Sequence, residues 1–249
     1  MTPRSLEIAE PVPRARDGID LVVATRAPES AAAPLRLRGV TKSWHPDRPP
    51  VLDELDLTLD PGSMTWVGGR NGVGKTTMLR IAAGLIDSDS GRVEVWGVAA
   101  GENRSLYQQL VSFLPAGDRG LYARLTVRKQ LEFCARIAML PRPRFREAVD
   151  EAIDTFDLHE LIERRVDRMS MGQRQRLRIA MTFLPRPEVV LLDEPLTSLD
   201  GEGAALLHQA IEKLIADDGA VLWCSPSGEN LDIPFDSRWT IEHGKLVAA

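Results

Sequence analysis

Residues 67–80 read VGGRNGVGKTTMLR, and this stretch decides the fold of the core. Gly69, Gly74, Lys75 and Thr76 satisfy the spacing G-x-x-x-x-G-K-S/T. Glycines at these positions let backbone N–H groups converge on phosphate oxygens, the lysine reaches the terminal phosphates, and the threonine hydroxyl can ligate Mg²⁺. So short a pattern also occurs by chance. Its meaning therefore depends on the elements that flank it.

The flanking residues supply the expected context for a phosphate-binding loop. SMTWVG (63–68) runs directly into the glycines, and TTMLRIAAGL (76–85) follows them. The second segment has helical spacing of its apolar residues, at Met78, Ile81, Ala82 and Leu85. The order strand, loop, helix predicts a nucleotide-phosphate cradle rather than a purely structural glycine turn.

A second candidate element lies far along the chain, in EVVLLDEP (188–195). Its continuous apolar run is typical of a central parallel strand covered on both faces. Asp193 ends this run, where a carboxylate could hold the magnesium shell. Glu194 follows and would project toward the terminal phosphate, which makes it the candidate for polarising an attacking water. The alternative is an acidic pair that only ends a solvated strand.

The rest of the chain is organised around these two elements. Alternating leucines predict strands in 35–38 and 55–60, and AVLWCS (220–225) predicts another buried strand. WTIEHGKLV (239–247) is typical of a hairpin turning at its glycine. Two amphipathic segments predict a helical insert, one with Val127, Leu131, Cys134 and Ala138 on one face and one with Phe145, Val149, Ile153 and Phe156.

Composition bounds the function class. The 249 residues are 43% hydrophobic, which suffices for a buried core, and the net charge of −5 argues against a surface built to hold nucleic acid. No apolar run approaches the ~18 residues that a bilayer span requires. Both cysteines, Cys134 and Cys224, are expected to be buried, reduced thiols. Residues 1–33 are predicted to be a mostly disordered extension, either a linker or a docking peptide for a partner.

Just before the second element lies RMSMGQRQRLRIAMTFLPRPEVVLLDEPLTSLD (168–200), and with it residues 35–247 resemble the ATP-binding cassette family. MSMGQ (169–173) is similar to the family's LSGGQ signature, GGRNGVGKTT (68–77) to its phosphate loop, LLDEP (191–195) to its second nucleotide motif, and SLD (198–200) to its D-loop. Ser170 and Gly172 precede a predicted helix, whose N-terminal end favours a phosphate.

The resemblance implies an α/β fold. Its P-loop NTPase core has a parallel central sheet, an N-terminal antiparallel β region and an inserted helical subdomain, here roughly 118–171 within a domain 34–249. It also implies two cassettes paired head to tail around ATP and Mg²⁺, each ATP lying between one copy's phosphate loop and the other copy's signature.

The implied nucleotide-binding residues are Trp44 against adenine, with Gly69, Asn71, Gly72, Val73, Gly74, Lys75, Thr76 and Thr77 around the phosphates. The signature is Ser170, Met171, Gly172 and Gln173, the D-loop contributes Ser198 and Asp200, the metal ligands are Thr76 and Asp193, and Glu194 is the catalytic residue. A tryptophan packed on the sheet is the alternative for Trp44.

Two family residues have no counterpart. The family has a glutamine after the strand that here reads VSFLP (111–115), where this chain has Ala116 and Gly117. It has a histidine after the strand AVLWCS, where this chain has Pro226, although Ser225, Ser227 or Asn230 could substitute. None of the four histidines, His45, His159, His208 and His243, follows that strand at the right distance. Tight MgATP binding with slow hydrolysis is expected, unless a different partner cassette supplies a better site.

The implied function is the energy-coupling ATPase subunit of a transporter that drives a separate transmembrane permease, in the manner of bacterial export-type cassettes. The second cassette is either identical or different, and the chain would lie in the cytoplasm on the inner face of the membrane. Arg119, Leu121 and Tyr122 are the candidate contacts with the permease, and a plain surface loop is the alternative. The rival functions are a soluble ATPase that acts on chromosomes or ribosomes and a regulatory nucleotide sensor.

Overall fold

The computed structural model describes residues 32–226 and 233–249. Its compact unit is Ala33–Ala249. The predicted N-terminal extension, apart from its last two residues, lies outside the described residues. Within the described ranges, no helix combines the length and apolar character needed to cross a bilayer.

A four-stranded antiparallel sheet opens the unit, in the order β2-β1-β4-β5. β1 (Leu35–Lys42) pairs with β2 (Leu52–Leu59) and with β4 (Ser90–Val95), which pairs with the short β5 (Val98–Ala99). The alternating leucines of β1 and β2 are buried, so the predicted N-terminal antiparallel β region is confirmed.

The second sheet is the core, with strand order β10-β9-β3-β8-β7-β6. β3 (Met64–Gly68), β6 (Val111–Leu114), β7 (Val189–Asp193), β8 (Ala220–Cys224) and β9 (Ser237–Glu242) pair in parallel, and β10 (Lys245–Ala248) closes an antiparallel hairpin with β9. The turn of that hairpin contains Gly244, as expected.

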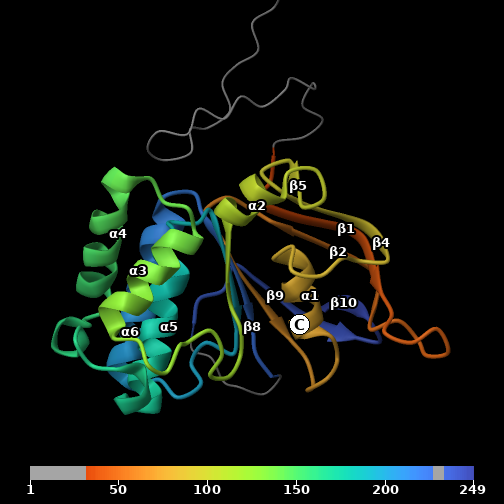
Figure 1. Ribbon diagram of the computed structural model, residues 1–249. Helices are drawn as coiled ribbons and strands as arrows, with labels where there is room; N and C mark the ends of the chain where they lie inside the picture. Colours follow the sequence, from red (N-terminus) through yellow and green to blue (C-terminus); the bar gives the residue numbers. More distant parts are fainter. Residues whose placement is uncertain (1–31, 227–232) are drawn as a thin grey trace, which may run out of the picture. The chain divides into compact units, whose positions relative to one another are not determined.

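Helices cover both faces of this core sheet (Figure 1). α3 (Val127–Ile137), α4 (Arg142–Thr155), α5 (Met171–Phe183) and α6 (Gly201–Ala216) lie on one side, whereas α1 (Lys75–Ala82) and the first sheet lie on the other. α2 (Arg104–Leu110) precedes β6, and short 3₁₀ turns at His159–Leu161 and Val166–Arg168 lead into α5.

Alternate residues of the central strands enter two separate hydrophobic cores. In β7, Val190 and Leu192 pack with the helices α3–α6, whereas Val189 and Leu191 pack with α1 and the first sheet. This two-sided burial explains the uninterrupted apolar sequence of the strand. It also leaves the carboxyl ends of the parallel strands β3, β6, β7 and β8 at one edge, where ligands bind in open α/β sheets.

Three local expectations need correction. α1 ends at Ala82, because Gly84 takes a left-handed conformation, and Leu85 is half exposed instead of lying on the buried helical face. α5 begins at Met171, so Gly172 lies inside its first turn rather than before it. Both cysteines are free thiols, but only Cys224 is fully buried, and Cys134 is partly exposed.

Candidate functional site

The phosphate loop connects β3 to α1 and depends on its glycines. Gly69 and Gly74 have φ of 146° and 122°, which side chains rarely adopt. A Cβ on Gly74 would lie 2.9 Å from the Val51 carbonyl oxygen, and one on Gly69 would lie 2.8 Å from Val73 Cγ1. The loop therefore folds tightly enough to turn successive N–H groups toward one ligand.

Lys75 is the first residue of α1, and its side chain lies back against the loop. Its Nζ donates to the carbonyl oxygens of Gly69 at 2.6 Å and Arg70 at 3.2 Å. The residue is 6% exposed, and it forms no ion pair within the described residues. A buried ammonium with only carbonyl partners is suited to an anionic ligand, because a second charge would compensate its desolvation.

Thr76 and Asp193 meet beside this lysine. Thr76 Oγ1 donates to Asp193 Oδ2 at 2.7 Å, and Asp193 is 2% exposed. Burial raises the pKa of Asp193, and the effect is opposed by the hydrogen bond from Thr76, the backbone N–H of Ala116 and the charge of Lys75.

This pair fits a magnesium ion better than it fits a closed metal cage. Its oxygen ligands are the type that Mg²⁺ prefers. Within the described residues no group of three or more His, Cys, Asp or Glu side chains could hold a metal by itself. That agrees with Mg²⁺, which takes one or two protein ligands and completes its shell with phosphate oxygens and waters. The metal ligands predicted from sequence thus lie together.

Glu194 occupies a strained position directly after β7. Its φ is 50°, the left-handed region that non-glycine residues avoid, and its N–H donates to the Cys224 carbonyl oxygen at 2.8 Å. This left-handed residue interrupts the alternation of side chains between the two faces of the strand. Glu194 is half-buried, whereas Asp193 is fully buried. Such strain is characteristic of functional positions.

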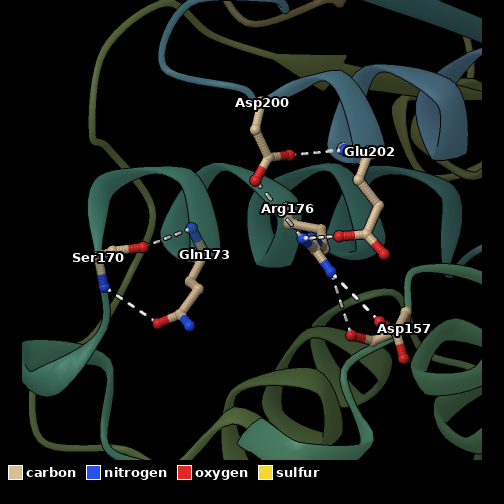
Figure 2. Close-up of polar contacts among 7 residues, drawn as sticks. Asp157, Ser170, Gln173, Arg176, Asp200 and Glu202 are labelled. Carbon is tan, nitrogen blue, oxygen red and sulfur yellow. Dashed lines mark hydrogen bonds and ion pairs between the residues drawn. The ribbon is translucent and has the colours of Figure 1, made fainter.

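The N-terminus of α5 carries the signature residues (Figure 2). Ser170 accepts the Gln173 N–H, and the Gln173 side chain accepts the Ser170 N–H, which forms a capping box. Ser170 and Met171 are exposed, and a Cβ on Gly172 would approach the Ser198 carbonyl oxygen at 3.1 Å. The exposed serine and the free N–H groups of the first turn make this end of the helix available to an anion.

The D-loop is fastened to α5 through Arg176, as Figure 2 shows. This guanidinium lies 3.9 Å from the Asp200 carboxylate, 3.4 Å from that of Glu202 and 3.5 Å from that of Asp157. Asp200 also caps α6 by accepting the Gly203 N–H at 2.8 Å. Signature and D-loop therefore form one connected surface.

Trp44 stands apart from the packed core. The side chain is 55% exposed, and Lys42 Nζ lies 5.4 Å from its ring centroid. The alternative that this tryptophan packs on the sheet, shielded from solvent, is wrong. An exposed indole face remains free to stack on a planar ligand.

These arrangements agree with one protein family. The family model described as "ABC transporter" matches residues 52–197, more than half of the chain. The chain belongs to the ABC transporter family. ABC ATP-binding domains are ATPases, so this is an ATP-binding ATPase subunit of a transport system.

Relatives agree with the assignment to the ABC family. The chain is 29% identical to the ABC transporter ATP-binding protein NatA of Bacillus subtilis over 78% of this chain and 79% of that protein. It is 32% identical to a daunorubicin resistance ATP-binding protein of Streptomyces coeruleorubidus over 80% of this chain and 62% of that protein. An ATP-binding cassette solved as a dimer in a post-hydrolysis state with ADP and Pi shares the fold, with TM-score 0.75, 20% identity and coverage of 85% of this chain and 96% of that one.

The residues that the resemblance matches to the family's glutamine and histidine lie at the edge where the candidate site forms. Pro115 and Ala116 follow β6, and Pro226 follows β8. Ser225 is fully buried and accepts the Trp66 indole N–H at 2.8 Å, so its hydroxyl already has a structural partner. Ser227 and Asn230, the other candidate substitutes, lie outside the described residues. None of the four histidines lies directly after β8, because His243, the one histidine beyond this strand, lies between β9 and β10.

The three predicted permease contacts differ in exposure. Tyr122 is 55% exposed and packs edge-on against Phe133, with ring centroids 5.0 Å apart. Leu121 packs against the helical core, and Arg119 is exposed while its carbonyl oxygen accepts from Arg178. Tyr122 and Arg119 are therefore the side chains of this loop that remain available to a partner.

Sequence reasoning missed the buried polar residues of α5, among them Gln175 and Arg178, which are 6% and 4% exposed. Gln175 donates to the Pro195 carbonyl oxygen at 2.8 Å, and Arg178 donates to Pro115 and Arg119 carbonyl oxygens. The available signal was an arginine between Leu177 and Ile179 on a helix that must pack against a sheet. A buried arginine needs partners, and loop carbonyls are common ones.

Proposed function

We propose that this chain pairs with a second cassette and that the two close around two MgATP. This closure drives a separate transmembrane permease, in the direction of export. The observation that carries the proposal is the buried Lys75, which among the described residues has carbonyl oxygens but no carboxylate as partners, beside the Thr76–Asp193 pair. Together these groups match the charge and the metal shell of a nucleoside triphosphate. Daunorubicin resistance, named for one relative, supports export. Through its permease, the subunit would be held on the inner face of the membrane.

Each site residue has a distinct role in this proposal. Loop N–H groups and Lys75 hold the phosphates, while Thr76 and Asp193 orient Mg²⁺, which neutralises charge on the phosphates when bound. Glu194 orients the attacking water and takes its proton. The second cassette contributes the N-terminus of its signature helix, the counterpart of Ser170 and α5, on the far side of the nucleotide. The N–H groups there stabilise the negative charge that develops as the terminal phosphoryl group is transferred to water.

We propose further that hydrolysis is slow, because Ala116 and Gly117 stand where the family has a glutamine and Pro226 stands where it has a histidine. None of these three residues has a side chain that offers a donor to a phosphate or water, and proline lacks a backbone N–H as well. Loss of one preorganised donor commonly costs roughly 10² to 10³ in rate, about 3–4 kcal/mol. Two losses in one site do not add, because such groups act as a unit.

Single-turnover hydrolysis of ATP by the purified chain tests both statements. We expect measurable MgATP binding, a slow rate, and loss of that rate in Glu194→Gln but not in Glu242→Gln, which alters an exposed strand residue. Introducing the family residues together, as Ala116→Gln and Pro226→His, should raise the rate at least about 10-fold. A wild-type rate that matches ordinary cassettes, with no gain from the double variant, contradicts the slow-site proposal.

Copurification separates transport from the two rival functions. A polytopic membrane protein that copurifies from native membranes supports the transport role. Nucleic-acid binding at moderate salt would instead favour the chromosome- or ribosome-associated ATPase. ATP-driven pairing with neither partner and negligible turnover would favour a regulatory sensor.

A further inference from the structure

One peptide group links α5 to the metal-ligand carboxylate. The carbonyl oxygen of Pro115 accepts a hydrogen bond from Arg178 Nη2. The N–H of the next residue, Ala116, lies near enough to the Asp193 carboxylate to act against the rise that burial causes in the pKa of Asp193. A cation therefore lies at the carbonyl end of the Pro115–Ala116 peptide and a carboxylate at its N–H end. The peptide dipole is aligned with both charges, so each charge polarises the peptide in the sense that strengthens the interaction at its other end.

Arg178 is held in place by carbonyl and amide oxygens rather than by a carboxylate. Besides Pro115, it donates through Nε to Arg119 at 3.0 Å and through Nη1 to Gln175 Oε1. Asp118, the charged neighbour that opposes desolvation, is itself ion-paired with Arg174 at 2.9 Å. Only the planar fork of a guanidinium can serve three acceptors in these directions, and a lysine cannot.

Gln175 continues the chain of hydrogen bonds to the other acidic residue. Its Oε1 accepts from Arg178, and its Nε2 donates to the carbonyl oxygen of Pro195, the residue directly after Glu194. Gln175 and Arg178 therefore hold both loops that border the site, the one after β6 and the one after β7. Because the polar groups of Arg178 and Gln175 are hydrogen-bonded in this way, we expect the two side chains to hold the loops rigidly.

We propose that Arg178 is a positioning residue for ATP hydrolysis, acting through the Pro115–Ala116 peptide on Asp193 and through Gln175 on the Glu194–Pro195 turn. In this chain a backbone N–H at residue 116 approaches the metal site at the position where the family resemblance expects a glutamine side chain, and Arg178 fixes that N–H. The inference rests on the proposed function, because it assigns the support of the same site.

Amide exchange in the nucleotide-free chain gives a readout that requires no activity. We expect Arg178→Met to speed exchange at Ala116 by about 10-fold, since a charge-assisted hydrogen bond no longer holds the peptide. Pro115 has no amide hydrogen, so in peptides spanning 114–120 Ala116 supplies the first amide after Leu114. Arg186→Met is the matched control, because Arg186 pairs with Glu147 and Glu151 on α4 and lies before β7, at the opposite end of the strand from Asp193.

Calorimetry with ATP, with and without Mg²⁺, provides the second readout. We expect Arg178→Met to leave metal-free ATP affinity unchanged, to reduce the gain in affinity from Mg²⁺ by roughly 10-fold, and to lower kcat with little change in KM. Arg178→Lys should recover part of the loss. Gln175→Leu should lower kcat and leave exchange at Ala116 nearer to wild type. If Arg178→Met does not fold, Arg178→Lys carries the same comparison in a milder form.

Two outcomes overturn the inference, and they are distinguishable. If wild type binds MgATP but the Arg178 variants match Arg186→Met in amide exchange, metal dependence and kcat, then Arg178 is structural only and the proposed function survives. If wild type shows no magnesium-dependent affinity for ATP, the proposed function fails and this role fails with it.

Discussion

Lys75 is the residue on which nucleotide affinity depends. It is buried, and in the described residues it has carbonyl partners but no carboxylate. We expect Lys75→Met to weaken ATP binding at least about 100-fold, roughly 3 kcal/mol, since one charge-assisted contact to phosphate is lost. The apo protein should be no less stable, because a desolvated charge is removed.

Melting curves with and without ATP measure both effects on one sample. Lys129→Met is the control, because Lys129 is an exposed residue in the first turn of α3. An apo melting temperature that falls while the ATP-induced shift persists would show that Lys75 is a structural residue.

At Glu194 the side chain proposed for hydrolysis comes with a backbone conformation that lowers the stability of the fold. Its left-handed backbone costs about 1–2 kcal/mol for most residues and less for asparagine, whose short polar side chain tolerates this region. We therefore expect Glu194→Asn to raise the free energy of unfolding by about 0.5–1 kcal/mol and to abolish hydrolysis. Glu194→Gln loses the same charge without the backbone relief, so it should lose hydrolysis without the gain, as denaturant unfolding of both variants can establish.

At the scale of elements, the Glu151 carboxylate connects α4 to two neighbouring segments. Glu151 accepts from Arg186 at 2.6 Å and from Lys213 of α6 at 2.8 Å. Burial acts to raise the pKa of Glu151, but the hydrogen bonds from Lys213 and Arg186 outweigh it and hold the pKa below its ordinary value. The charged carboxylate is therefore favoured by the fold.

The lowered pKa gives this contact a definite pH dependence. A carboxyl group whose pKa is lower in the folded state stabilises the protein above its unfolded pKa, and that stability is lost as pH falls through the folded pKa. We expect Glu151→Gln to cost about 1 kcal/mol near pH 7, with the difference from wild type shrinking below about pH 4. Glu147→Gln, at a carboxylate 63% exposed, should cost far less in the same urea titrations. A cost for Glu151→Gln that does not change with pH contradicts the ion-pair account.

Elements were predictable where a single segment carries the pattern. The alternating leucines of β1 and β2 and the apolar runs of β7 and β8 each report their own burial, so the strands and the parallel type of the core sheet followed from local sequence. The antiparallel type of the first sheet came from the family resemblance. The phosphate loop was predictable for the same reason, because its spacing is contained in residues 69–76.

Contacts between segments far apart in sequence were not predictable in this way. Arg178 and Pro115 are separated by 63 positions, and no local pattern states that they meet. Leu85 fails for a related reason, since helical spacing continues past the residue at which Gly84 ends α1. The candidate site was thus predicted in its ligand-facing residues and missed in the buried residues that hold them.

At the scale of the whole molecule, the exposed Ser170 terminus and the cradle around Lys75 are complementary halves of the proposed composite site. If two copies pair head to tail, each cradle faces the other copy's signature, as a two-fold interface requires. A chain carrying Lys75→Met retains a good signature, and a chain carrying Ser170→Arg retains a good cradle. Either variant alone should be inactive, because every site in its dimer lacks one half.

Mixing these two variants should restore hydrolysis. Random pairing makes half of the dimers mixed, and each mixed dimer has one complete site of two, so about a quarter of wild-type single-turnover activity is expected. The control mixture contains Lys75→Met with Arg70→Met in place of Ser170→Arg. Arg70 is exposed and contributes only its backbone carbonyl to Lys75, so the Arg70→Met chain should be active by itself, before mixing. If the mixture of Lys75→Met and Ser170→Arg stays inactive while the wild-type chain is active, the two halves do not meet across identical copies, and the second cassette must be a different chain.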